Sequence, residues 1–319
     1  MSNFNRDLFL EPTVKQYGSH MVMTNVHKTN KTKYINIDTR FRDEYQNNEI
    51  VNYNVTLPER INDIKQMSVK AIELPMTMYN ISSALGNNYF KISNIPLNAS
   101  KMIVLPDGQY TLASLSSFIS SEIANTDYKL NYLLFGINNN KSSFYRVSYD
   151  GANSQENNYN ITIDFAVDKD GNFDKYNLKT KLGWLLGYRN ISYEIKHIFD
   201  NNISIYTNSE SFIDLYGSKY LYLAINEFSK SNPSSFITPL PTSFINKSII
   251  ARITLDNSKY IFNSILPANI YNGLLVSDVR TYNGKIDIQK LNLQLLNEFG
   301  NPISLNEMDF SLCLEVEYE

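Results

Sequence analysis

Short runs in which apolar and polar residues alternate are the feature that most constrains how this 319-residue chain folds. In residues 52–57, Tyr53, Val55 and Leu57 alternate with polar residues, so an extended strand would carry all three on one face. Similar strand-like runs span residues 67–74, 86–92, 143–149, 158–167, 202–207, 219–225, 247–255, 285–296 and 309–318. Turn sequences rich in Gly, Pro, Asn and Asp separate many of them, at residues 106–108, 170–172, 272–273, 283–284 and 300–302. This pattern predicts a protein built mainly of β-strands.

Two stretches have the periodicity of a helix instead. Between residues 110 and 125, five apolar residues recur at helical spacing, and Thr111 is placed to cap the N-terminus of the helix. The five are Leu112, Leu115, Phe118, Ile119 and Ile123. Residues 178–188 predict a short helix or turn around Trp184, the only tryptophan. We therefore expect an all-β sandwich or barrel with a helix-bearing middle segment.

The expected organisation has an arm followed by a β-sandwich region. Residues 1–33 show neither periodicity and predict an extended N-terminal arm, which is either a loose terminus or a segment that docks on a neighbouring subunit. Residues 34–319 form the β-sandwich region. Within it, the helix-bearing residues 101–199 are an insertion or a second subdomain.

The composition argues against several classes of protein. Hydrophobic residues make up 43% of the chain and charged residues 19%, which is typical of a folded globular protein. The net charge of -3 gives no attraction to nucleic acid, so no direct nucleic-acid partner is expected. The opening residues lack the apolar core of a secretory signal, and no apolar run approaches the roughly 18 residues of a membrane span. We expect a soluble protein without a transmembrane segment.

No pattern in the sequence predicts catalysis. The three histidines, His20, His27 and His197, have no histidine or cysteine at the spacing of metal ligands, and Cys313 is the only cysteine. There is no phosphate-binding glycine-rich motif and no nucleophile elbow. We therefore expect no catalytic residues and no cofactor.

Acidic residues gather in two places where a metal or acid–base site is conceivable. Asp168, Asp170 and Asp174 are spaced closely enough to surround a hard cation, but they lack the remaining ligands of an EF-hand. We favour a hairpin tip, because Asp-Gly supplies the positive φ of a tight turn. Near the C-terminus, Glu315, Glu317 and Glu319 alternate with apolar residues and share a strand face. We expect that face to be solvated rather than to be a glycosidase site.

A dense charge cluster follows the arm in the sequence YINIDTRFRDEY. It contains Asp38, Arg40, Arg42 and Asp43. We expect these side chains to form ion pairs and charge-assisted hydrogen bonds that fix the start of the folded region. Exposed pairs contribute little to stability, so their role would be geometric unless they are buried.

Several phrases of the sequence, in their order, carry a resemblance to a known family. The N-terminal phrases are INIDTRFRDEY, NYNVTLPERINDIKQMSVKAIELPMTMYNIS and GNNYFKI, and the middle ones are VLPDGQYTLASLSSFI and KLGWLLGYR. YLYLAINEFSKS, NKSIIARI and YNGKIDIQKLNLQLLNEFGNPISLNEMDFSLCLEVEYE follow. Together they resemble virion structural proteins of nucleocytoplasmic large DNA viruses (giant viruses), over most of residues 34–319. The arm has no counterpart.

The resemblance implies a minor capsid or penton-like protein built on jelly-roll-type β-sandwiches. It implies other capsid proteins as partners, in a homo-oligomer or in contact with the major capsid protein. It also implies location in the virion after synthesis in the host cytoplasm, and no catalytic residues. The chain looks short for a double jelly-roll major capsid protein, which favours the minor or vertex role. Two alternatives stay open: a surface fibre or attachment protein that binds host glycan and, remotely, a virion-borne hydrolase.

Overall fold

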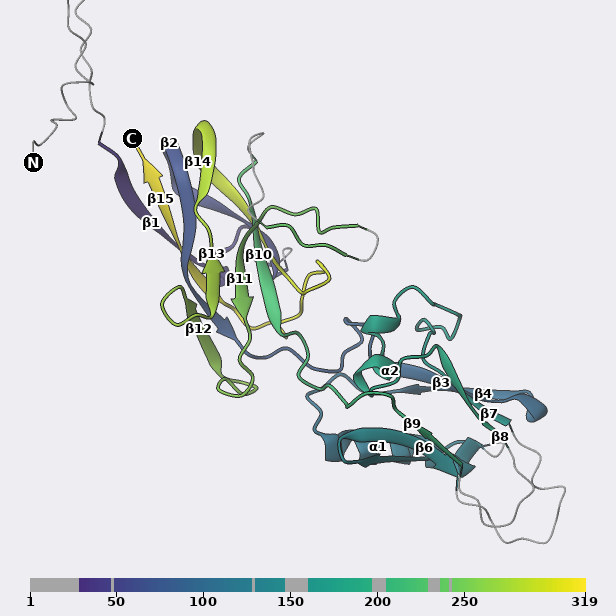
Figure 1. Cartoon of the computed structure of the whole chain (residues 1–319). Coiled ribbons are helices and arrows are strands. Elements are labelled where there is room, and N and C mark those ends of the chain that lie inside the picture. Colours follow the sequence, from purple (N-terminus) through teal and green to yellow (C-terminus); the bar gives the residue numbers. More distant parts are fainter. Residues whose placement is uncertain are drawn as a thin grey trace, which may run out of the picture.

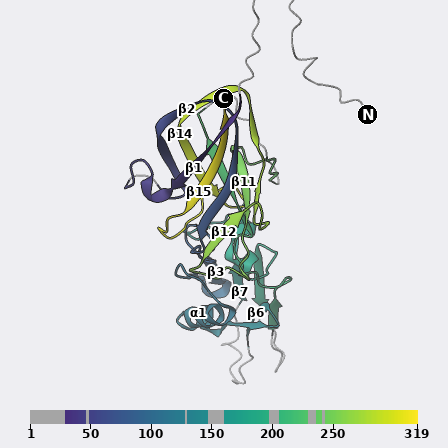
Figure 2. The ribbon, with the colours of Figure 1, turned by 90° about the vertical axis from the view of Figure 1, so that its left-hand side faces the viewer.

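The chain folds into two bodies, each with its own hydrophobic core (Figure 1). The computed structural model describes residues 29–46, 49–127, 130–146, 160–196, 205–228, 236–240 and 243–319. The larger body contains the first and the last described strands, and the smaller body is inserted between two strands of the larger one. Figure 2 shows the two bodies end to end, which makes the molecule elongated.

Among the described residues, the larger body is built on one antiparallel sheet of eight strands. Its strands are β1 (Lys31–Asp38), β2 (Asn52–Pro75), β10 (Tyr220–Asn226), β11 (Ile249–Thr254), β12 (Ile265–Asn269), β13 (Leu275–Ser277), β14 (Arg280–Leu296) and β15 (Ser311–Tyr318). The order is β1-β15-β2-β14-β10-β11-β13, and β12 also pairs with β2. The sheet curls until β13 lies beside β2, where the backbone N of Val69 donates to Oγ of Ser277 over 3.0 Å. The apolar side chains that point inward from these strands form the main core inside the curl. A smaller cluster contains Tyr222 and Ala224 of β10, Ile249 of β11, Leu296 of β14 and Ile245.

Strand β2 differs from the expectation of two separate strands, residues 67–74 after residues 52–57. It is one continuous strand of 24 residues that ends at Pro75. Its pairing with β14 shifts between Thr56 and Ile61, and the exposed Pro58 lies in this irregular stretch. Because a bulge leaves residues outside the ladder, a proline without an N–H group is tolerated there without ending the strand.

In the part of the smaller body that the structure describes, there are two sheets and two α-helices. One sheet has the order β4-β3-β7-β8 and the other β5-β6-β9. The strands are β3 (Tyr89–Asn94), β4 (Ala99–Val104), β5 (Leu134–Asn138), β6 (Lys141–Arg146), β7 (Asn160–Asp164), β8 (Ser192–Lys196) and β9 (Ile205–Asn208). The helices are α1 (Leu112–Ala124) and α2 (Leu182–Leu185). Short 3-10 helices span Thr39–Phe41 in the larger body, and Ile95–Leu97, Leu130–Tyr132 and Leu178–Thr180 in the smaller one.

The predicted helix near residue 115 is confirmed, including its cap. The hydroxyl of Thr111 accepts from the backbone N of Ser114 (3.2 Å), and Oγ of Ser114 accepts from the backbone N of Thr111 (2.9 Å). This reciprocal pair is a capping box, which satisfies two backbone donors at the start of the helix. The buried side of α1 carries Leu115, Ile119 and Ile123.

Aromatic rings fill the core of the smaller body. Phe90 and Phe144 lie edge to face at 5.6 Å, and Phe165 stacks on Tyr188 at 4.9 Å. The buried side chains of this core come from residues between Ile81 and Ile195. The interpretation of residues 101–199 as an insertion or subdomain stays a prediction.

The expected all-β class with a helix-bearing middle is confirmed, and the antiparallel strands are consistent with a jelly-roll-type protein. Strand β1 already begins at Lys31, inside the segment expected to be an arm, because it pairs along its whole length with β15. Residues 1–28 of the expected arm lie outside the described residues. Among the helices that the structure describes, none is long and apolar enough to cross a membrane.

Candidate functional site

The predicted charge cluster surrounds the first 3-10 helix, directly after β1. The carboxylate of Asp38 accepts from the backbone N of Arg40 (2.9 Å) and from its guanidinium (2.6 Å). This contact with Arg40 holds the pKa of the Asp38 carboxyl below its usual range. The side chain of Arg40 is nevertheless 65% exposed. This half of the cluster is a solvated ion pair.

Arg42 makes the buried half of the cluster. Its side chain is only 4% exposed and donates to the carbonyl oxygens of Thr39 (2.9 Å) and Tyr45 (3.0 Å). The guanidinium lies 3.9 Å from the centre of the Tyr45 ring and 3.4 Å from the carboxylate of Asp309. A cation in this position joins the turn after β1 to the segment before β15.

Two further side chains attach the same turn to neighbouring strands. The hydroxyl of the buried Thr39 donates to Asp309 (2.7 Å) and accepts from the backbone N of Phe310 (3.0 Å). The carboxylate of Asp43 accepts from the backbone N of Thr56 (3.0 Å) and from its hydroxyl (2.6 Å). All of these contacts join parts of the fold, which supports a structural role; the role itself stays a prediction.

The three aspartates of the candidate metal site lie on a turn of the smaller body. The Asp168 carboxylate accepts from the backbone N of Asp170 (2.9 Å) and of Asn172 (2.9 Å), and the bonds from Asn172 lower its pKa. The Asp174 carboxylate lies 3.1 Å from Nζ of Lys181. Nowhere in the described part of the chain do three His, Cys, Asp or Glu side chains gather as a metal ion requires.

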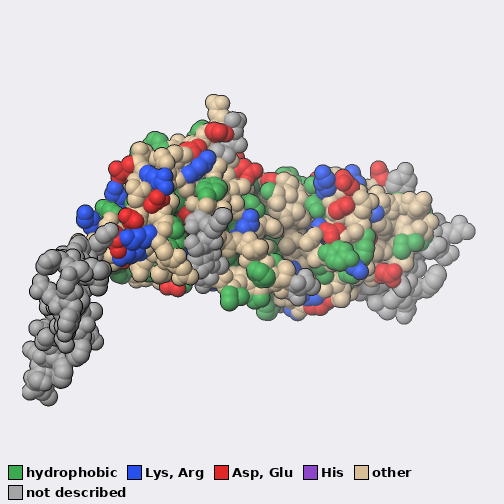
Figure 3. All heavy atoms as spheres, turned by 90° about the horizontal axis from the view of Figure 1, so that it is seen from above, with side chains coloured by type: hydrophobic (Ala, Val, Ile, Leu, Met, Phe, Trp, Pro, Cys, Tyr) green, Lys and Arg blue, Asp and Glu red, His purple; other side chains and the backbone are tan. Residues whose placement is uncertain are grey.

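Two of the three glutamates of β15 and its end form ion pairs on the outside of the larger body, and the third, Glu317, accepts a hydrogen bond from the amide of Asn30. Glu315 pairs with Lys70 at 2.8 Å, and Glu319 pairs with Lys65 at 2.7 Å. The hydrogen bond from Lys70 lowers the pKa of Glu315, whereas a general acid needs a raised one. Figure 3 shows charged side chains of both signs over the larger body, at the end that faces away from the smaller one.

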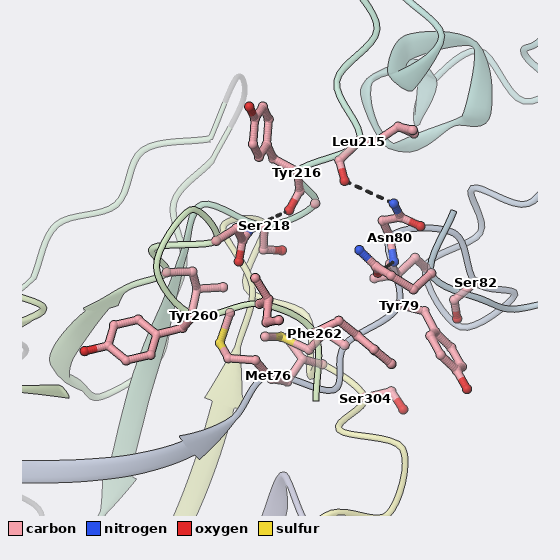
Figure 4. Close-up of a pocket in the computed structure, with 18 of the residues that line it drawn as sticks. Met76, Tyr79, Asn80, Ser82, Leu215, Tyr216, Ser218, Tyr260, Phe262 and Ser304 are labelled. Atoms are coloured by element: carbon pink, nitrogen blue, oxygen red, sulfur yellow. Dashed lines mark hydrogen bonds between the residues drawn. The ribbon is translucent and has the colours of Figure 1, made fainter. Parts of the chain in front are cut away.

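A groove lies where the two bodies meet (Figure 4). Its volume is about 480 Å³, within the roughly 300–1,000 Å³ of ligand pockets. Five segments that are far apart in the sequence line it: residues 76–85, 109–112, 213–218, 255–262 and 303–306, together with Asn140. The described residues of this lining include methionine, leucine, isoleucine, aromatic, serine and amide side chains, but no charged one.

Asn80 connects three of the segments at the groove by hydrogen bonds. Its amide nitrogen donates to the carbonyl oxygens of Tyr110 (2.9 Å) and Leu215 (3.1 Å), and its amide oxygen accepts from the backbone N of Tyr110 (2.8 Å). Because residues near 80 and 215 are the two connections between the bodies, this buried amide joins both connections to the smaller body. The contact to Leu215 is drawn in Figure 4.

The rim of the groove exposes apolar side chains. The rings of Tyr79 and Phe262 stack at 5.9 Å, and Ile261 and Tyr216 are each 68% exposed. Exposed apolar patches beside a groove are typical of sites that bind a ligand or another protein. The groove is therefore our candidate functional site. A second hollow of about 590 Å³ adjoins it. Its lining, by contrast, contains charged side chains: Lys179, Lys181, Asp214, Lys219 and Glu298.

Sequence reasoning missed this groove, and it also missed one buried ion pair in the larger body. Arg280 and Glu227 contact each other with fully buried side chains, and Tyr282 donates to the same carboxylate over 2.7 Å. Arg280 also donates to the carbonyl oxygens of Ile225 (2.9 Å) and Ser248 (2.8 Å). Burial first, and then the nearby Glu227, raises the pKa of Tyr282. This network joins the ends of β10, β11 and β14.

Comparisons with known proteins give similarity in structure only. No protein family and no curated protein matches the sequence. Among solved structures, the mavirus penton protein aligns with a TM-score of 0.40 and 12% identity, over 92% of this chain and 100% of that chain. A chain of the Sputnik virophage aligns with a TM-score of 0.38 and 12% identity, over 90% of this chain and 98% of that one. These are similarities of overall fold alone.

Proposed function

We propose that this chain is a non-enzymatic structural component of a large DNA virus particle, a minor capsid or penton-like protein that acts through contacts with other subunits. The proposal rests first on the ordered sequence phrases between residues 34 and 319 that resemble virion structural proteins. Its location would be the virion, after synthesis in the host cytoplasm.

One observation in the structure carries the proposal. The charged residues that the sequence singles out are engaged in bonds that hold strands and turns together, as Arg42 and Glu315 illustrate. The groove and its rim, in contrast, offer uncharged apolar and aromatic surface, which suits a contact with another protein better than chemistry on a small polar substrate.

The partners we propose are further copies of this chain or the major capsid protein. Beyond the groove, aromatic side chains such as Phe41 and Tyr271 protrude from the larger body, and Tyr is favoured at interfaces because it combines contact area with a polar tip. A clean test is purification of particles on a density gradient followed by quantitative mass spectrometry. The chain should follow the major capsid protein at a constant ratio; its absence from particles would refute the proposal.

A second candidate, binding of host glycan, is favoured by one observation. Tyr176 is 85% exposed and Phe173 is 67% exposed, and both follow the acidic turn at residue 170 within six positions. Exposed rings next to carboxylate and amide groups suit stacking on a sugar. A glycan array should then give signals that the Tyr176→Ala variant loses, whereas an array without any signal would dismiss this candidate.

A further inference from the structure

The junction groove is built to receive an uncharged, apolar group. Its described lining contains no acidic or basic side chain, so an ionic group entering it would lose its hydration without gaining a partner. Met76, Met78 and Phe262 supply adaptable apolar contact, because methionine side chains are unbranched and flexible. The amides of Asn257 and Asn306 at its border already donate within the chain, to Tyr216 and Thr77 respectively. The groove therefore favours a short apolar peptide over a phosphate, a carboxylate or a sugar acid.

The chain itself contains a segment of this kind outside the described residues. Residues 8–10 are Leu-Phe-Leu, flanked by Asp7 and Glu11 and followed by Pro12. This places three large apolar side chains together, with the charges at both ends. Lys259, exposed beside the Tyr260 ring of the groove, is positioned to receive one of those carboxylates at the rim.

The register of the strands shows at which end of the larger body β1 begins. Lys31, at the start of β1, pairs with Tyr318 of β15. Tyr318 in turn pairs with Ile64 of β2 on its other side. The groove begins at Met76, twelve residues further along the chain from Ile64, which is about 40 Å away at strand spacing. Both β1 and β2 are antiparallel to β15, so they run in the same direction, toward the groove. The start of β1 therefore lies at the end of the larger body opposite to the groove (Figure 1).

We propose that the groove of one copy binds residues 8–10 from the N-terminal arm of a second copy. This inference rests on the proposed function and names the contact through which copies assemble. The stretch from Glu11 to Thr29 spans up to about 60 Å when extended, which is enough to reach a neighbouring subunit. This length also exceeds the distance of about 40 Å to the chain's own groove, so the experiment includes a chain that carries both cysteines. The contact joins two different surfaces, the arm of one copy and the groove of the next, so it is a head-to-tail contact. Such a contact can repeat from copy to copy, and it closes a ring when the rotation between neighbouring copies permits.

Disulfide trapping in the full-length chain tests the proposal. In a Cys313→Ser background, one copy carries Phe9→Cys and the other carries Ile261→Cys on the exposed rim. After mild oxidation of the mixture, the linked dimer should exceed that of a control pair by about tenfold or more, because docking raises the local concentration of the two thiols. The control replaces Ile261→Cys by Tyr271→Cys, which is 93% exposed and lies outside the groove lining.

A second pair, Leu8→Cys with Tyr216→Cys, repeats the experiment at other positions. The test therefore still gives a result if one variant of the first pair folds poorly. A synthetic peptide of residues 1–28 should lower the yield of both groove pairs, and the same peptide with Phe9→Asp should not. Yields equal to the control in both pairs would overturn the proposal. A chain that carries both Phe9→Cys and Ile261→Cys and links only within itself at every dilution would overturn it as well, because its own arm would then fill the groove.

The result is separable from the test of the proposed function. If trapping fails while the chain still follows the major capsid protein through the gradient, the docking is wrong and the virion role stands. If trapping succeeds and the chain is absent from particles, the virion role is wrong.

Discussion

Replacement of Arg42 by methionine should destabilise the larger body, whereas the same replacement of Arg40 should not. Arg42→Met keeps an apolar stem of similar length but removes the donors to the carbonyl oxygens of Thr39 and Tyr45. It also removes the cation from the face of the Tyr45 ring. Arg40 has the same charge two positions earlier and pairs with Asp38 in solvent, so it is a matched control.

The contacts of Arg42 set the size of the effect. Each hydrogen bond to a backbone carbonyl contributes about 0.5–1.5 kcal/mol. The contact with the ring contributes about 0.5–1 kcal/mol more, and the pair with Asp309 is long at 3.4 Å. We expect Arg42→Met to lower the free energy of unfolding of the larger body by about 1.5–4 kcal/mol in total. Arg40→Met should leave it unchanged, because an exposed ion pair contributes little.

The two bodies need separate probes, since a chain with two cores need not unfold in one step. Hydrogen exchange of peptides from β1 and β15, followed in urea, reports on the larger body. Fluorescence of Trp184, the only tryptophan, reports on the smaller body and should be the same in both variants. Equal losses of protection in Arg40→Met and Arg42→Met would refute the reasoning that burial decides the role of this cluster.

Three further predictions concern other parts of the molecule. Gly183→Ala would place a Cβ atom 2.3 Å from Cγ of Phe165, so the smaller body should lose about 1–3 kcal/mol of stability, measured by tryptophan fluorescence in urea. Glu227→Ala would leave the Arg280 guanidinium buried without its counter-charge, which should cost about 3–5 kcal/mol, measured by calorimetry. The folded pKa of Glu315 lies below its ordinary value of 4.5, so its stabilising contribution is complete above pH 4.5 and is lost as the pH falls through the lower folded value. The protection factors of amides in β15, which compare the observed exchange rate with the intrinsic rate at the same pH, should therefore fall on acidification, and they should fall less in Glu315→Gln.

Each of these predictions has a control or an outcome that contradicts it. At Gly217 an added Cβ meets no atom within 4 Å, so Gly217→Ala should show only the smaller cost of its positive φ. Glu49→Ala removes an exposed carboxylate, and a loss as large as that of Glu227→Ala would argue against the buried pair. An identical acid response of Glu315→Gln and the parent chain would show that this carboxylate is not linked to folding.

The sequence predicted the helices and strands whose formation depends on neighbouring residues in the chain. Helix α1 follows from the spacing of its apolar residues and from the cap at Thr111, all within a short stretch of sequence. The long strands β14 and β15 follow from alternation over many residues. These patterns were sufficient to predict the all-β class of the fold.

The elements that escaped prediction depend on distant partners. Strands β4, β5, β8, β12 and β13 have only three to six residues, too few for alternation to stand out, and β12 also contains Pro267. Strand β1 forms within the expected arm because β15, at the other end of the chain, supplies its pairing edge. Residues 52–57 and 67–74 were expected to be separate strands, because nothing in the sequence near Pro58 shows that the pairing with β14 accommodates a bulge there.

The candidate site could be predicted only in part for the same reason. The charge cluster was visible as a run of charges, but the burial of Arg42 depends on Asp309, 267 positions away. The groove has five lining segments spread between residues 76 and 306, and none of them is unusual alone. Glu227 follows the end of β10 and Arg280 begins β14, with no local sign of each other.

The central claim is that this chain is a part of a virus particle, and its amount in purified particles tests it most directly. Quantitative mass spectrometry across a density gradient should show the chain rising and falling with the major capsid protein at one fixed ratio. A chain that remains in the infected-cell extract, with none in the particle fractions, would contradict the claim.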